Sequence, residues 1–332
     1  MLLVGYGRRG RQWYEHCRRR RDLELVGVVD PELSAQDAAR RAGLAVWPSL
    51  EPALEEGLAR WALLASPPGE HPDQAIACLR AGLPVLVEKP LALSLADAAR
   101  IVQESSRVGL PVAVGQNFRY LPRERAVRKA LAEDFGRPVS ALVISARPPT
   151  VAAPHLGAIE HGAVWDICLH HLDSLRLRFG APPATVEMTI DELPSGTAPR
   201  THFTIRLGWD EGTAVGYLHS EGAPAFHHTE WIEGSRSAIL VEGQNVSVAL
   251  PNRRPRRIRT PRGPTPEDAV LDEFVATVDG GGEGSLGADE NLATVATVEA
   301  ALRAASSGRA VAPADIAAAS GVKLGATMAG HV

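Results

Sequence analysis

A glycine-rich turn stands close to the start of the chain. Gly5-Tyr6-Gly7-Arg8-Arg9-Gly10 directly follows the apolar run Leu2–Val4 and opens the helical segment Arg9–Arg20. In such a pattern the first glycine permits a tight turn, the second lets the backbone approach a pyrophosphate, and the third lets helix and strand pack closely. Helix N-termini favour anions. The turn therefore predicts a dinucleotide-binding unit, with Gly5, Tyr6, Gly7, Arg8, Arg9 and Gly10 as cofactor contacts.

An acidic residue follows at the spacing that dinucleotide-binding units require. Asp30 lies at the end of the next predicted strand, Leu23–Val29. A carboxylate there accepts hydrogen bonds from the adenosine ribose hydroxyls and repels a 2′-phosphate. We therefore expect NAD as the cofactor. NADP stays possible, because Arg8 or Arg9 could meet a phosphate.

The first 120 residues alternate short apolar runs with helical segments, the βαβ pattern of a parallel sheet. Leu95–Val108 has helical periodicity, with Ser94 placed to cap its start. We expect residues 1–120 to form a dinucleotide-binding Rossmann domain. Its predicted strands are Leu2–Val4, Leu23–Val29, Ala62–Ala65, Pro84–Val87 and Pro111–Val114.

The pattern changes after residue 120. Helices are predicted over Pro122–Glu133, Val164–Phe179, Glu267–Val278 and Asp289–Ser306. Strands follow one another with little helix between, which favours a mostly antiparallel sheet. We expect residues 121–332 to form a substrate-binding and oligomerisation domain of the α+β class. Its predicted strands are Val139–Ala146, Ala184–Ile190, His202–Leu207, Ala214–His219, His228–Ile232 and Val246–Leu250.

Composition narrows the class of protein. A chain of 332 residues is long enough for two domains, and a net charge of −4 gives no broad basic surface for nucleic acid. No apolar run approaches the roughly 20 residues that span a bilayer. The first strand leaves no room for a signal peptide, so we expect a cytoplasmic protein without a membrane partner. Cys17, Cys78 and Cys168 are far apart in the sequence, which suits a reducing compartment and predicts no metal site.

A lysine stands in the most specific segment of the chain, Val85–Leu91. Lys89 follows Glu88 and precedes Pro90 at the end of a predicted parallel strand, beside the expected cofactor crevice. Of 35 basic residues, the only other lysines are Lys129 and Lys323. Because arginine cannot release a proton, this exception indicates that a titratable amine is needed.

The glycine turn and the Glu-Lys-Pro segment together resemble the Gfo/Idh/MocA family of oxidoreductases, which includes inositol dehydrogenases and glucose–fructose oxidoreductase. Further similar segments lie along the chain: Ser66–His71, Ala81–Val85, Val114–Tyr120, Trp231–Ser237 and Glu290–Val311. The resemblance implies a Rossmann domain plus an α+β domain with a large, mostly antiparallel open sheet. It implies cofactor contacts from Ser66, Pro67, His71, Glu88, Lys89 and Gln116, and substrate contacts from Lys89, Asn117, Arg119, Tyr120, Asp166 and His170.

Asp166–Asp173 resembles the family's D-x-G-x-H-x-x-D element, except that Cys168 replaces the glycine. On a regular helix Asp166, His170 and Asp173 share one face, which could address one substrate. We expect His171 to point away from that face. Cys168 is expected to pack within the helix rather than to react.

The resemblance implies an enzyme that transfers hydride between NAD(P) and a secondary alcohol or ketone of a sugar, cyclitol or related polyol. By resemblance, and because histidine titrates near neutrality, His170 would take the hydroxyl proton. Lys89 would hydrogen-bond the reacting oxygen, and Asp166 would bind a neighbouring hydroxyl.

Two other functions stay open: an imine or other non-carbohydrate reductase on the same fold, and a catalytically silent NAD(P)-binding sensor. We also expect a homodimer or homotetramer. The candidates for its interface are apolar strand residues of the second domain: Val215, Tyr217, Trp231 and Ile239.

Overall fold

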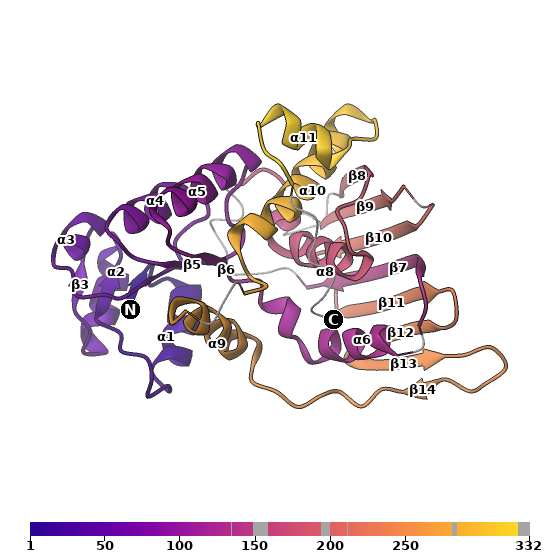
Figure 1. The fold of residues 1–332 in the computed structure, drawn as a ribbon, viewed down its shortest axis with the longest axis horizontal. Coiled ribbons are helices and arrows are strands. Elements are labelled where there is room, and N and C mark those ends of the chain that lie inside the picture. Colours follow the sequence, from indigo (N-terminus) through magenta and orange to yellow (C-terminus); the bar gives the residue numbers. More distant parts are fainter. Residues whose placement is uncertain (134, 149–158, 194–199, 211, 281–283, 325–332) are drawn as a thin grey trace. The chain divides into compact units, whose positions relative to one another are not determined.

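A computed structural model describes residues 1–133, 135–148, 159–193, 200–210, 212–280 and 284–324 (Figure 1). The chain forms two compact units. The first contains Met1–Asn117 together with Pro264–Val295, and the second contains Phe118–Gly263 together with the rest of the chain. A segment near the C-terminal end therefore returns to the first unit.

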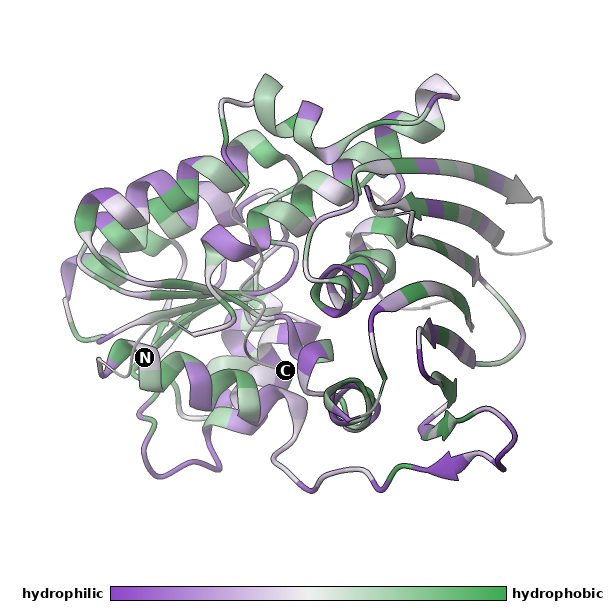
Figure 2. Ribbon diagram, turned by 45° about the vertical axis from the view of Figure 1, so that its right-hand side comes forward, coloured by the Kyte–Doolittle hydropathy of each residue, from purple (hydrophilic) through white to green (hydrophobic). Residues whose placement is uncertain are grey.

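The first unit is built on a six-stranded sheet in the order β3-β2-β1-β4-β5-β6, with every neighbouring pair parallel. In this order the strand sequence reverses between β1 and β4, which is where doubly wound sheets bind dinucleotides. The central strands are fully buried, and Figure 2 shows them as almost wholly hydrophobic. The strands are β1 (Leu2–Val4), β2 (Gly27–Val29), β3 (Val46–Trp47), β4 (Ala62–Leu64), β5 (Val85–Val87) and β6 (Val112–Val114).

Helices connect these strands as the sequence predicts. The Ser94 hydroxyl caps α5 by accepting a hydrogen bond from the Asp97 backbone N–H, at 3.1 Å. The two-residue strand β3 was not predicted, because it is too short to show a period. The helices are α1 (Arg8–Cys17), α2 (Leu33–Arg41), α3 (Leu50–Glu55), α4 (His71–Arg80), α5 (Leu95–Val108) and α9 (Pro266–Val278), followed by α10 (Ala288–Ser307), within which the chain passes to the second unit.

Polar contacts hold the returning helix α9 against α1. His16 Nδ1 lies 3.0 Å from an Asp268 carboxylate oxygen, and Arg20 NH1 donates to Asp272 at 2.5 Å. An isolated bridge joins Ala113 in β6 to Gly287. These contacts make residues 264–295 part of the Rossmann unit.

The second unit carries an eight-stranded sheet in the order β14-β13-β12-β11-β7-β10-β9-β8. All neighbouring pairs are antiparallel except β7 with β10, so the sheet is mostly antiparallel, as predicted. Its strands are β7 (Pro138–Arg147), β8 (Thr185–Leu193), β9 (Arg200–Gly208), β10 (Ala214–Glu221), β11 (His227–Gly234), β12 (Ala238–Glu242), β13 (Asn245–Ala249) and β14 (Arg256–Arg257).

One face of this sheet is buried under helices of the same unit. They include α6 (Pro122–Ala132) and α8 (Leu169–Phe179), while α11 (Pro313–Ala319) lies near the end of the described chain. Hydrophobic and hydrophilic residues alternate along the strands (Figure 2). Such alternation is expected when one sheet face packs and the other faces solvent.

The alternation corrects the expected interface residues. Val215, Tyr217 and Ile239 are at most 1% exposed and lie on the covered face, whereas Trp231 is 44% exposed. A side chain changes face at every residue of a strand. The sequence shows which residues alternate, and it does not show which of the two sets the helices cover. Among the described residues no helix is long and apolar enough to cross a membrane.

Candidate active site

Two glycines of the turn lie against other backbone atoms, and the third has open space beside it. A Cβ on Gly5, which has φ +89°, would lie 2.6 Å from the Ser66 backbone nitrogen. A Cβ on Gly10 would lie 2.0 Å from the Gly5 carbonyl oxygen, whereas one on Gly7 would meet nothing within 4 Å among the described residues. Gly7 is the N-cap of α1 and has no side chain to fill that space. The turn thus fits a pyrophosphate at the helix N-terminus.

Asp30 is held against the same turn. Its Oδ2 accepts a hydrogen bond from the Tyr6 backbone N–H at 2.6 Å, and its Oδ1 accepts one from the Glu32 N–H at 2.9 Å. Gln36 Nε2 donates to the Asp30 carbonyl at 2.9 Å. A carboxylate has about four lone-pair positions, so each oxygen can still accept a bond from a hydroxyl. This geometry fits an adenosine ribose.

Glu88 joins the end of β5 to α1. Its Oε1 accepts bonds from Arg9 Nε at 2.5 Å and from Trp13 Nε1 at 2.7 Å, and its Oε2 accepts one from the Lys89 N–H at 3.0 Å. Arg9 also contacts Glu267 at 3.1 Å. Burial alone would lower the pKa of Arg9, but these two carboxylates raise it. Arg9 and Glu88 were expected to contact the cofactor, and in the structure they pair with each other.

Lys89 leaves the C-terminal end of β5, half-buried, beside a turn that His71 supports. His71 Nδ1 lies 2.8 Å from the Pro90 carbonyl oxygen, and Nε2 lies 3.1 Å from the Ser66 carbonyl oxygen. The His71 side chain is fully buried. The sequence predicts that His71 contacts the cofactor directly. In the structure its ring lies between the turn that contains Ser66 and the turn that contains Lys89, and contacts the backbone of both.

The other predicted contacts range from exposed to buried. Arg8 and Pro67 are exposed, Ser66 and Tyr120 are half-buried, and Gln116 is buried. The Ser66 hydroxyl lies 2.5 Å from Gln74 Oε1, and Asn117 Nδ2 donates to Glu267 Oε1 at 3.0 Å. Arg8 and Pro67 are thus the most accessible of these groups.

In the second unit, the predicted helix Val164–Phe179 begins differently from the expectation. Val164–Cys168 forms a π-helical turn, and α8 continues from Leu169. Asp166 lies in the wider turn and His170 lies in the α-helix, so regular helical spacing does not relate them. Single π-helical turns are frequent at functional sites.

The two adjacent histidines have different surroundings. The His170 ring stacks on Phe118 at a centroid distance of 3.9 Å and an angle of 7°. His171 faces the sheet, with the rings of Tyr217 and His228 at 5.1 Å and 5.2 Å. Burial, and then the charge of His228, hold the pKa of His171 well below its ordinary value. His170 and His171 therefore differ in their main neighbours, Phe118 for His170 and the sheet residues Tyr217 and His228 for His171.

Asp173 and Arg119 form a buried ion pair. Arg119 Nε and NH2 each donate to a different Asp173 oxygen, both at 2.7 Å, and Arg176 NH2 donates to Asp173 at 3.3 Å. Arg119 is 4% exposed and Asp173 1%. Arg119 was expected to bind substrate and Asp173 to share the substrate-facing surface of the helix. In the structure both side chains are buried and form an ion pair with each other.

Arg147, at the end of β7, was not predicted. Its NH2 donates to Asp166 Oδ2 at 2.8 Å, and its Nε donates to Glu221 of β10. His219 Nε2 lies 3.1 Å from the same Glu221 oxygen. Burial alone would lower the pKa of Arg147, but Asp166 and Glu221 raise it above its ordinary value. Arg147 lies four residues after the buried Val143, so its side chain is on the same face of the strand. This alternation was the sequence signal from which its inward position could have been predicted.

A second charged cluster lies under α8. Arg178 NH2 donates to both Glu124 oxygens, at 2.8 and 2.7 Å, and Arg178 NH1 donates to Glu230. His228 Nε2 lies 2.7 Å from Glu230 Oε1. Burial opposes ionisation of Glu230, but Arg178 and His228 outweigh it and hold the pKa of Glu230 well below its usual value. This cluster ties α6, α8 and β11 together.

The cysteines are buried. Burial raises the pKa of Cys17 and of Cys78 to about 12, and it raises that of Cys168 well above its ordinary value. A reactive thiol needs a lowered pKa and exposure, so these side chains act in packing. Within the described part of the chain, no three histidine, cysteine or acidic side chains form a group that could hold a metal ion.

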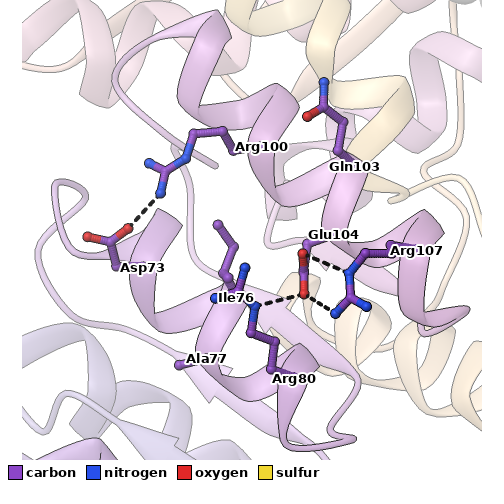
Figure 3. Close-up of a pocket in the computed structure, with 8 residues that line it drawn as sticks. All are labelled: Asp73, Ile76, Ala77, Arg80, Arg100, Gln103, Glu104 and Arg107. Carbon is purple, nitrogen blue, oxygen red and sulfur yellow. Dashed lines mark hydrogen bonds and ion pairs between the residues drawn. The ribbon is translucent and has the colours of Figure 1, made fainter.

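A hollow between α4 and α5 is lined by arginines, and these arginines form ion pairs with neighbouring acidic side chains (Figure 3). Arg80 and Arg107 both contact Glu104, and Arg100 lies between Asp73 and Asp97. These arginines are more than half exposed. Ion pairs at such exposure contribute little, so the hollow offers no distinct site.

Comparison with known proteins identifies the first unit. Residues 1–116 match the family described as "Oxidoreductase family, NAD-binding Rossmann fold", GFO_IDH_MocA. The match covers most of the first unit, which therefore has the NAD-binding Rossmann fold of that family. The chain is a nicotinamide-dependent oxidoreductase, and its glycine turn and Asp30 are suited to the cofactor.

Similarity to individual members of the family extends into the second unit. The oxidoreductase is 27% identical over 260 residues to 1,5-anhydro-D-fructose reductase of Ensifer adhaerens, covering 72% of this chain and 75% of that protein. It is 25% identical over 326 residues to inositol 2-dehydrogenase of Rhizobium meliloti strain 1021, covering 91% and 95%.

The fold is shared with a solved oxidoreductase from Agrobacterium radiobacter in complex with NAD+, L-tartaric acid and magnesium. The TM-score is 0.82 at 21% identity, covering 95% of this chain and 98% of that one. The two-unit architecture is thus the one found in this oxidoreductase.

Proposed function

We propose that this oxidoreductase transfers hydride between NAD and a secondary alcohol or ketone of a sugar, cyclitol or related polyol. The supporting relatives act, by their names, on an anhydro-ketose and an inositol. The observation in this chain that carries the proposal is the partly exposed Asp166 carboxylate, which lies in the π-helical turn that leads into the helix of His170 and is held by Arg147. Such an acceptor beside a titratable ring suits a substrate with neighbouring hydroxyls.

The residues divide the work as follows. The nicotinamide, when bound, supplies hydride acceptance or donation. His170 takes the hydroxyl proton during oxidation and returns it during reduction. Lys89 donates a hydrogen bond to the reacting oxygen, and Asp166 accepts one from an adjacent hydroxyl. Asp30 favours NAD over NADP.

The test is a turnover assay with NAD+ and inositols, aldoses and polyols, and with NADH and the corresponding ketones. We expect activity on at least one vicinal diol class. Activity confined to imines, or cofactor binding without turnover on the whole panel, would contradict the proposal and favour the imine reductase or the silent sensor.

We further propose that the enzyme is a cytoplasmic homodimer or homotetramer that associates through the open face of its large sheet. Three large apolar side chains are exposed there, Leu142 at 51%, Leu218 at 44% and Trp231 at 44%. Trp231 pairs with Leu142 across β11 and β7, and Leu218 lies on the neighbouring strand β10. A contiguous exposed apolar patch of this kind is typical of association surfaces. The three buried free thiols are compatible with a reducing cytoplasm.

A further inference from the structure

The polar side chains behind Asp166 form a ladder that leads into the buried interior of the second unit. Arg147 NH2 donates to Asp166 Oδ2 at 2.8 Å, and Arg147 Nε donates to Glu221 Oε2. His219 Nε2 lies 3.1 Å from that same oxygen. The ladder runs from β7 to β10, two strands that pair in parallel with Arg147 opposite Glu221.

Exposure falls along this ladder. The Asp166 and Arg147 side chains are 20% and 16% exposed, Glu221 is 14% exposed, and His219 is fully buried. The His219 ring also stacks on Phe203 at 4.8 Å. One end is therefore fixed in the core, and the other end reaches solvent at the Asp166 carboxylate.

The shape of arginine matters at position 147. A guanidinium can donate in two directions from one rigid plane, whereas an ammonium is a single point charge. Arg147 uses Nε toward Glu221 and NH2 toward Asp166. A lysine could not hold both carboxylates in the same geometry.

We propose that Arg147 is a positioning residue that holds the Asp166 carboxylate in place and aims it at a substrate hydroxyl. Held this way, Asp166 acts only as a hydrogen-bond acceptor and leaves proton transfer to His170. The proposal rests on the proposed function, because it assigns Asp166 to substrate. Glu221 and His219 act one step further back, by fixing the plane of the Arg147 guanidinium.

The test is a double-mutant cycle of R147M and D166N, assayed with the best substrate of the wild-type enzyme. We expect R147M to lower kcat/KM by about tenfold to a hundredfold, the effect of losing one charge-assisted hydrogen bond. In the D166N background, the same R147M change should cost less than threefold, because Arg147 acts through Asp166. R147K should recover only part of the loss, and guanidinium ion added to R147A should restore part of it.

Equal loss from R147M in both backgrounds would overturn the proposal, since a merely structural arginine would act independently of Asp166. The same conclusion follows if R147M has the kcat/KM of the wild type. NAD binding, measured by fluorescence or calorimetry, should be unchanged in every variant. If instead the wild-type enzyme turns over no alcohol or ketone, the proposed function fails, and that result is distinct from full activity in R147M.

Discussion

The backbone N–H of Tyr6 donates to the Asp30 carboxylate at 2.6 Å, so the glycine turn and the acid at the end of β2 form one hydrogen-bonded unit. The two residues are 24 positions apart. Parallel pairing of β1 with β2 brings them together at the carboxyl end of the sheet. We therefore expect the choice between NAD and NADP to depend on the same turn that would receive the pyrophosphate.

Replacing Asp30 should relax the cofactor preference. D30S removes the negative charge that repels a 2′-phosphate, while the hydroxyl can still accept from the Tyr6 N–H. We expect the ratio of NADPH to NADH affinity to rise by about tenfold or more. Titration of both cofactors measures it, with D37S on α2 as a surface control. Tighter binding of NADPH than NADH by the wild type would show that the assignment is wrong.

Lys89 should be required for turnover and dispensable for cofactor binding. Both K89A and K89R should fold and bind NAD, because the glycine turn and Asp30 are unchanged. Arginine keeps the charge, but it is bulkier and holds its proton permanently. We expect kcat to fall by roughly two or more orders of magnitude in both variants. K129A on α6 is the matched control, and wild-type turnover in K89A would falsify the catalytic role.

The adjacent histidines offer a matched pair. H170A should lower kcat/KM by about 10²-fold or more, because it removes the proposed proton acceptor. H171A should leave kcat/KM within about threefold, since the His171 ring faces Tyr217 and His228 on the sheet. Steady-state kinetics at saturating NAD measure kcat/KM for both variants and for the wild type. Equal losses in both variants would mean that the two histidines act as one packing unit, without a catalytic distinction.

Sequence patterns predicted the fold well where the signal was local. The glycine turn, the cap at Ser94 and the helix over Leu95–Val108 are all present at the expected residues. The return of residues 264–295 to the Rossmann unit left no such signal, because it depends on pairings such as Arg9 with Glu267, 258 positions apart. Hydrophobic periodicity indicates whether a segment is a helix or a strand. It does not indicate which part of the chain the segment packs against.

The candidate site was predicted in its residue types and less well in its pairings. Lys89, Asp166 and His170 stand out because their types and spacing carry chemistry. Arg119 was expected to bind substrate by the same reasoning, yet its Nε and NH2 both donate to the buried Asp173 carboxylate. In a chain rich in arginine, the sequence alone cannot show which arginines form ion pairs with buried carboxylates.

Buried histidines should make the enzyme less stable in mild acid. Burial lowers the pKa of His71, His171 and His219, so the folded chain leaves them neutral where the unfolded chain binds protons. Their stabilising effect is present above about pH 6.5 and is lost as pH falls below it, by up to about 1.4 kcal/mol per pH unit for each histidine. Urea unfolding at pH 7.5, 6.5 and 5.5 should show H171Q with a shallower slope than the wild type. H227Q, at an exposed histidine, should keep the wild-type slope, and an unchanged slope in H171Q would contradict the assignment.

A charge placed on the open sheet face should dissociate the oligomer. Trp231 lies on the β11 side of the patch, opposite Leu142 of β7, and it is 44% exposed in the single chain. Burying a glutamate in a self-complementary apolar contact is costly, because the charge appears on both copies and finds no partner. We expect light scattering at micromolar concentration to report a dimer or tetramer for the wild type and a smaller species for W231E. L33E changes an exposed leucine on α2 of the other unit and should leave the mass unchanged. A monomeric wild type would refute the proposed assembly, and an unchanged mass for W231E would place the interface on another surface.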